Sequence, residues 1–116
     1  MTKPLTRDQA ANACVEILDT EFFNALCEPT RVQLVRILVL NGRSDIQTLA
    51  SNFPQDRSVI ARPLQVMERA GIVVSEKVGR HQFFELDGPT MVQRVEAILD
   101  LMRVIVPICC PGKGPA

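Results

Sequence analysis

Residues 56–86 read DRSVIARPLQVMERAGIVVSEKVGRHQFFEL, and this stretch combines a helical pattern with a strand pattern. From Asp56 to about Ala70, apolar side chains recur every three or four residues, which is typical of a helix with one buried face. The inward positions are Ile60, Leu64 and Met67. Asp56 suits an N-cap and Gly71 suits the end of a helix. The first half of the stretch therefore predicts one amphipathic helix.

The second half of the stretch is rich in β-branched and aromatic residues, which gather at 72–76 and 82–86. The connecting residues 77–81 hold a glycine among cationic side chains. This pattern predicts a β-hairpin with a basic tip. A helix followed directly by such a hairpin, and preceded by another short helix, is the order of a winged helix-turn-helix.

Upstream of this stretch, apolar spacing and capping residues predict four more helices. Their expected ranges are 7–19, 21–27, 31–40 and about 46–53, the last capped by Ser44 or Asp45. Pro29 and Thr30 are expected to break the chain and to cap the third of these helices. Downstream, residues 87–89 predict a turn into a last helix, which Pro107 is expected to interrupt. The predicted fold is mostly α-helical with a β-hairpin wing.

The last predicted helix has an unusually wide apolar face. Its apolar positions are Met91, Val92, Val95, Ile98, Leu99, Met102, Ile105 and Val106. The first helix carries a similar stripe, formed by Ala11, Cys14, Val15 and Leu18. A single small domain cannot cover so much apolar surface, so we expect a homodimer in which the first and last helices pack against their copies.

Length and composition favour one soluble domain over residues 1–116, with flexible ends at about 1–6 and 111–116. Apolar residues make up 47% of the chain, which is enough for one core, and 13 basic side chains balance 13 acidic ones. The longest apolar run, 37–40, is far shorter than the roughly 20 residues of a membrane span. We therefore expect a cytoplasmic protein without a membrane partner.

Polar and basic side chains on the outward face of the 56–70 helix suit the edges of bases in a DNA major groove. The candidate DNA-binding residues of the helix are Arg57, Ser58, Arg62, Gln65 and Arg69, and those of the hairpin are Lys77, Arg80 and His81. A dimer would present two such helices to a double-stranded, pseudo-palindromic operator. A solvated helix face or a protein-interaction module are the alternatives, because the net charge is zero. No phosphate loop, nucleophile elbow or spaced carboxylate pair indicates an enzyme.

Three pieces of the chain resemble the ArsR family of metal- and metalloid-responsive winged-helix repressors. They are Pro-Thr-Arg at 29–31, Glu-Arg-Ala-Gly-Ile at 68–72 and Gly-Arg at 79–80, within a resemblance that spans about 26–86. The resemblance implies dimerisation through the first and last helices and release from DNA when an inducer binds. Where the family usually has Ser and His in its reading helix, this chain has Ala61 and Pro63. We therefore assign base contacts to Ser58, Arg62 and Gln65.

The adjacent thiols Cys109 and Cys110, in a proline-flanked segment, are the candidate inducer site. Thiolates are soft ligands, and trivalent arsenic or antimony suits three of them in a pyramid. Cys14 is the preferred third ligand, because its stripe should lie near the last helix, and Cys27 is the alternative. Both Cys14 and Cys27 also suit core packing, as free cysteines often do.

Other sensor types fit the sequence less well. The Cys-x-Cys pattern of many arsenic and cadmium sensors is absent from residues 44–48, and the last helix has no histidine that could bind zinc, nickel or cobalt. The expected inducer is As(III) or Sb(III), with no organic cofactor. The alternative is a repressor that responds to oxidants or persulfides through the same thiols.

Overall fold

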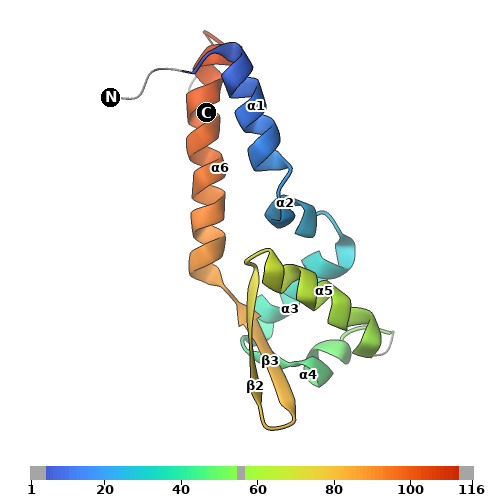
Figure 1. Ribbon diagram of the computed structural model, residues 1–116. Helices are drawn as coiled ribbons and strands as arrows, with labels where there is room; N and C mark the ends of the chain where they lie inside the picture. Colours follow the sequence, from blue (N-terminus) through green and yellow to red (C-terminus); the bar gives the residue numbers. More distant parts are fainter. Residues whose placement is uncertain (1–4, 55–56, 113–116) are drawn as a thin grey trace.

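The computed structural model describes residues 5–54 and 57–112, with the side chains of residues 57 and 58 excluded. The elements are α1 (Arg7–Leu18), α2 (Glu21–Ala25), α3 (Pro29–Asn41), β1 (Ser44–Asp45), α4 (Ile46–Ala50), α5 (Arg57–Arg69), β2 (Val73–Val78), β3 (His81–Leu86) and α6 (Gly88–Cys109). Figure 1 shows a lower globular part that contains α3, α4, α5 and the hairpin, and an upper part where α1 lies beside α6. The prediction of a mostly helical fold with a hairpin wing is confirmed.

The core lies between α3, α4, α5 and the sheet. Ile60, Leu64 and Met67 of α5 have no exposed surface, as their helical spacing predicts. They pack in one cluster with Leu34 of α3 and Leu49 of α4. This packing fixes which face of α5 turns outward, because the inward face is fully occupied.

The strands β2 and β3 form a tighter hairpin than the sequence predicts. Val78 pairs with His81, so only Gly79 and Arg80 form the turn, and the expected linker of residues 77–81 is too long. Gly79 adopts a φ of 61°, which a two-residue turn with glycine in its first position requires. The hairpin, called the wing below, therefore holds Lys77 and His81 within its strands.

The sheet has a third strand, and its order is β1-β3-β2. Ser44 pairs with Phe84 and Asp45 pairs with Phe83, both antiparallel. This two-residue strand attaches the wing to the start of α4. Asp45 is then the N-cap of α4, where its carboxylate accepts a hydrogen bond from the Thr48 amide at 2.9 Å.

The N-cap of α3 is Glu28, and the expectation that Thr30 caps this helix is wrong. The Glu28 carboxylate accepts hydrogen bonds from the amides of Thr30 at 3.0 Å and Arg31 at 3.1 Å. Pro29 is the first helical residue, where its missing N–H costs nothing. The Arg31 guanidinium in turn donates to the carbonyl of Ala25 at 2.6 Å, which ties α3 to the end of α2.

Glu28→Gln should reduce the stability of the protein at neutral pH by about 0.5–1 kcal/mol, because the half-buried cap loses its charge. The Thr30 amide, above all, holds the pKa of the Glu28 carboxyl below its usual range. A lowered pKa gives stability that is present above the unfolded-state pKa and is lost as the pH falls through the folded-state pKa. Urea unfolding at about pH 7 and about pH 3 should therefore show a difference between the two proteins only at the higher pH.

Two prolines lie inside helices. Pro107 does not interrupt α6, which contradicts the prediction, since the helix continues to Cys109. The proline removes a single amide donor near the end of the helix, and the Cys110 amide still reaches the Val106 carbonyl at 2.8 Å. Likewise α5 is one helix through Pro63, which is half-buried.

At the upper end, Thr6 and Gln9 form a capping box that begins α1. Thr6 belongs to the expected flexible end 1–6, and most of that end, like most of 111–116, lies outside the described residues. None of the described helices is long and apolar enough to cross a membrane.

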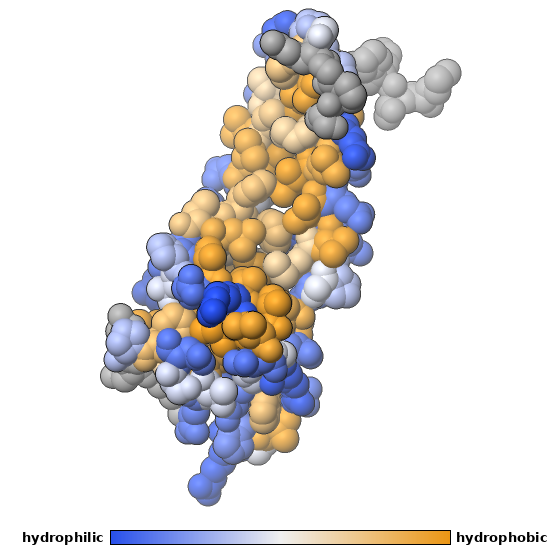
Figure 2. All heavy atoms as spheres, turned by 180° about the vertical axis from the view of Figure 1, so that it is seen from behind, coloured by the Kyte–Doolittle hydropathy of each residue, from blue (hydrophilic) through white to orange (hydrophobic). Residues whose placement is uncertain are grey.

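The upper part of the molecule leaves much apolar surface uncovered. Ile105 of α6 is buried, yet large apolar side chains of α1 and α6 are at least two-fifths exposed. They are Val15, Leu18, Val92, Val95, Leu99 and Val104. Figure 2 shows apolar residues gathered over this upper part. The radius of gyration is 18.1 Å, against about 13 Å for a compact domain of this length.

Candidate nucleic-acid interface and thiol site

The outward face of α5 is polar and basic, as predicted. Arg62, Gln65 and Arg69 are exposed and line a surface hollow of about 460 Å³ together with Ala61 and Val66. The side chains of Arg57 and Ser58, which were predicted to contact DNA, lie outside the described residues. The guanidinium and amide groups of Arg62 and Gln65 are one helical turn apart, so both can reach the edges of neighbouring base pairs.

Arg69 differs from the other predicted contacts, because it has a partner within the chain. Its Nε lies 3.8 Å from Oε1 of Glu21 at the start of α2, and both side chains are about two-thirds exposed. Arg69 is also in the last turn of α5, whereas recognition helices usually contact bases through their N-terminal residues. Its geometry thus suits the attachment of α2 to α5 better than base readout.

A chain of side-chain hydrogen bonds joins α5 to the wing. The Ser75 hydroxyl of β2 donates to Oε2 of Glu68 on α5 at 2.6 Å. The Gln82 amide of β3 donates to the same hydroxyl at 3.3 Å. These contacts set the wing at a fixed position relative to the outward face of α5, so that both can meet one duplex.

The tip of the wing exposes the predicted cations Lys77 and Arg80. The side chain of His81, the third predicted contact, is 55% exposed, and its Nδ1 lies 3.3 Å from Oδ2 of Asp45. The Thr48 side chain and amide, with a smaller effect of His81, hold the pKa of the Asp45 carboxyl below its usual range. His81 therefore joins the wing to the start of α4, while Lys77 and Arg80 are placed to contact phosphates.

Two of the three predicted thiol ligands line one hollow at the other end of the molecule, and Cys110 is not part of its wall. Cys14 of α1 and Cys109 of α6 line one hollow of about 430 Å³, whose wall also includes Arg7, Ala10 and Ile105. The expectation that the stripe of Cys14 lies near the last helix is confirmed, because α1 packs along α6 within one chain. We call this space the thiol hollow.

Cys109 and Cys110 are in direct contact, with their sulfur atoms 3.0 Å apart. The hydrogen bond with Cys109, followed by burial, raises the pKa of the Cys110 thiol. Two thiolates bound to one ion at about 2.3 Å are at most about 4.6 Å apart, and the two sulfurs lie within this limit. Among the described residues, however, no three Cys, His, Asp or Glu side chains converge into a ready metal site.

Cys27 lies in a different place from the other thiols. It follows α2, is exposed, and its sulfur donates to the Phe23 carbonyl at 3.2 Å. The expectation that it packs in the core is therefore wrong, because the chain turns here toward α3 and leaves the side chain at the surface. In Figure 1 this turn is far from the end where α1 and α6 meet near the C-terminus.

Comparison with known proteins assigns the fold and the family. No family model matches the chain. A crystal structure of a possible transcriptional regulator for arsenical resistance is 33% identical, with a TM-score of 0.62, over 71% of this chain and 83% of that chain. The chain belongs to the ArsR family of winged helix-turn-helix transcriptional regulators.

Two further structures agree with this assignment. An ArsR family transcriptional regulator is 25% identical, with a TM-score of 0.64, over 75% of this ArsR-family chain and 87% of its own. A homodimeric winged helix-turn-helix DNA-binding domain from Mycobacterium bovis, a possible ArsR-family regulator, shares the fold at 20% identity, with a TM-score of 0.60, over 88% of this chain and 89% of its own. The relatives are regulators, which confirms the prediction that this protein is not an enzyme.

The sequence did not predict the role of Arg43, which contacts both strands of the wing in this ArsR-family regulator. Its guanidinium lies 4.5 Å from the centre of the Phe83 ring and 3.7 Å from Oε2 of Glu76. It also missed the pairing of Asp45 with His81. These partners are more than 30 positions apart and meet only because β1 pairs with β3, and a two-residue strand gives no periodic pattern in the sequence.

Proposed function

We propose that this regulator is a homodimeric repressor that binds operator DNA through α5 and the wing and is released when a thiophilic inducer, trivalent arsenic or antimony, binds its thiols. The observation that carries the inducer part is that Cys14 and Cys109 line one hollow where α1 meets α6, and that Cys110 touches Cys109. The same two helices carry the uncovered apolar surface. A ligand bound to the thiols would thus act at the dimer contact.

Dimerisation is supported by three observations. The exposed apolar side chains of α1 and α6 are not covered by any of the residues that the structure describes, and the molecule is far from compact. The Mycobacterium bovis neighbour with this fold is described as homodimeric. In such a dimer a second copy of α1 and α6 would cover these side chains, and two α5 helices would face adjacent major grooves.

The mechanism is thermodynamic linkage between binding of the inducer to the thiols and binding of the dimer to DNA. Cys109 and Cys110 supply two adjacent sulfurs, and Cys14 of α1 lines the thiol hollow together with Cys109. Recruiting Cys14, from the same subunit or its partner, would draw α1 toward the end of α6 and change how the dimer packs. An inducer lowers operator affinity only to the extent that it prefers the dimer with the lower DNA affinity.

The test is fluorescence anisotropy of the reduced protein on a duplex from its own promoter region, with and without a slight excess of arsenite. Arsenite should release the wild-type protein from DNA. Cys110→Ser should bind DNA as the wild type does and lose the response to arsenite. Cys27→Ser is the matched control and should keep the response to arsenite. Cys14→Ser tests whether Cys14 is the third ligand.

Two results would count against the arsenite mechanism. One is a Cys110→Ser protein that still responds to arsenite, and the other is a variant that no longer binds DNA at all. The 3.0 Å contact between the sulfurs also favours a second candidate, in which the pair is a redox switch. Hydrogen peroxide would then oxidise the two thiols to a disulfide and be reduced to two waters. Release of DNA by peroxide but not by arsenite would select this candidate.

A further inference from the structure

A second hollow lies in the middle of the molecule, away from the thiols and from the outward face of α5. Its volume is about 330 Å³, and it opens between the end of α1, α2 and the first half of α6. It is lined by Ile17, Thr20, Phe22, Thr90, Gln93, Arg94, Ala97 and Ile98. Neither DNA binding nor the thiol switch uses these side chains.

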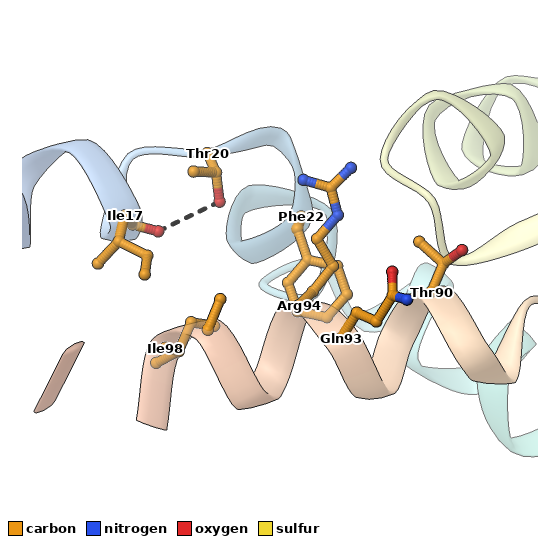
Figure 3. Close-up of a pocket in the computed structure, with 8 residues that line it drawn as sticks. Ile17, Thr20, Phe22, Thr90, Gln93, Arg94 and Ile98 are labelled. Atoms are coloured by element: carbon orange, nitrogen blue, oxygen red, sulfur yellow. Dashed lines mark hydrogen bonds between the residues drawn. The ribbon is translucent and has the colours of Figure 1, made fainter. Parts of the chain in front are cut away.

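The lining combines apolar and polar side chains. Figure 3 shows Ile17 and Ile98 at one end, beside Thr20, whose hydroxyl donates to the Ile17 carbonyl at 3.4 Å. Thr90, Gln93 and Arg94 lie toward the other end. The guanidinium of Arg94 reaches away from α6 toward α2. Four of the eight lining residues are apolar and four are polar, and a hollow that offers both kinds of contact suits a small molecule with an apolar part and a charged group.

Arg94 is the chemically decisive group in this hollow. Within the part of the chain that the structure describes, no carboxylate lies within ion-pair distance of Arg94. Its guanidinium packs at the turn after α5, where a Cβ on Gly71 would lie 3.8 Å from Nε and Nη2. Gly71, at a φ of 82°, also leaves room there for the Thr90 methyl group, which a Cβ would approach to 3.0 Å. Arg94 is exposed, and its cation lies at the edge of the hollow with no carboxylate partner among the described residues.

We propose that this hollow binds a small organic acid whose carboxylate pairs with Arg94 and whose hydrocarbon part lies against Ile17, Phe22 and Ile98. A guanidinium forks onto a carboxylate with two parallel hydrogen bonds, and such charge-assisted bonds are the strong ones. One cation matches a single negative charge, so a monocarboxylate fits better than a phosphate dianion. The proposal is independent of the thiol inducer, because no lining residue is a cysteine.

The experiment is a titration of the reduced dimer of residues 1–116 with hexanoate, followed by ¹H–¹⁵N NMR, with hexan-1-ol as the uncharged probe of equal length. Hexanoate should bind in the millimolar range or tighter, as a ligand of about eight non-hydrogen atoms can. It should shift the amides of Gly71, Ala97 and Ile98 and leave that of Gly79 at the wing tip unchanged. Hexan-1-ol should bind about tenfold more weakly.

Arg94→Gln should weaken hexanoate binding by about tenfold or more and leave the affinity for hexan-1-ol unchanged. Arg103→Gln, which removes an exposed cation from the same helix outside the hollow, should bind hexanoate as the wild type does. Ala97→Leu should fill the hollow and abolish the binding of both probes. Three results would overturn the proposal: no shifts at Gly71 and Ile98, equal binding of both probes, or unchanged hexanoate binding by Arg94→Gln. The absence of shifts at Gly71 and Ile98 is also the result expected if the partner subunit fills the hollow.

Discussion

Leu99→Glu should convert the protein from a dimer into a monomer. Leu99 is 42% exposed on α6, beside Val95 and Val92 in the surface that we assign to the dimer contact. A carboxylate buried there in two copies costs far more than the lost apolar contact, because each charge would have to leave water without a partner. Light scattering after gel filtration should give a mass near 12.9 kDa for the variant and twice that for the wild type.

The same substitution should weaken operator binding by roughly 100-fold or more, because a monomer loses the effective concentration that the second half-site provides. Val39→Glu is the matched control. Val39 is 68% exposed on α3, outside α1 and α6, so this variant should remain a dimer. A dimeric Leu99→Glu protein, or a wild-type monomer at micromolar concentration, would refute the proposed interface.

Arg62→Ala should lower the affinity for operator DNA by roughly 5- to 150-fold per half-site, since a good contact between a side chain and a base is worth about 1–3 kcal/mol. Arg62 is exposed on the outward face of α5 and has no ion-pair partner among the described residues. The fold should survive, because the inward face of α5 is unchanged. Anisotropy titrations on the promoter duplex measure the effect.

Arg36→Ala removes an exposed arginine from α3, outside α5 and the wing, and serves as the control for charge. It should bind DNA within a small factor of the wild type. Equal losses in Arg62→Ala and Arg36→Ala would mean that only net charge matters and that α5 does not read bases. Arg69→Ala should lose less affinity than Arg62→Ala, because Arg69 already pairs with Glu21.

The sequence predicts the lower half of the fold well, because its signals are periodic. The spacing of Ile60, Leu64 and Met67 identifies both the helix and its buried face, and all three are fully buried. Single residues that signal where a helix begins or ends are less reliable predictors. Glu28 caps α3 in place of Thr30, and α6 continues through Pro107, because a single missing amide donor is tolerated so near a helix end.

In the candidate sites, too, features that follow from periodic spacing are predicted and contacts between distant segments are not. That Cys14 would approach the last helix follows from its place on an apolar stripe, and the structure places it in one hollow with Cys109. The exposure of Cys27 and the partners of His81 and Arg69 depend on how distant segments meet. Asp45 reaches His81 through β1, and Glu21 reaches Arg69 because α2 packs on α5. These contacts join residues that are distant in the sequence, so no periodic spacing predicts them.

The measurement that tests the central claim most directly is the salt dependence of binding to the promoter duplex by the wild-type protein. Contact with phosphates through α5 and the wing releases counterions, so the logarithm of the binding constant should fall linearly with the logarithm of salt concentration, by about 0.9 per phosphate contact. A steep slope, together with preference for the promoter duplex over an unrelated one, is the predicted result. Binding that is absent, or that does not change with salt, would contradict the account and favour a protein-interaction module.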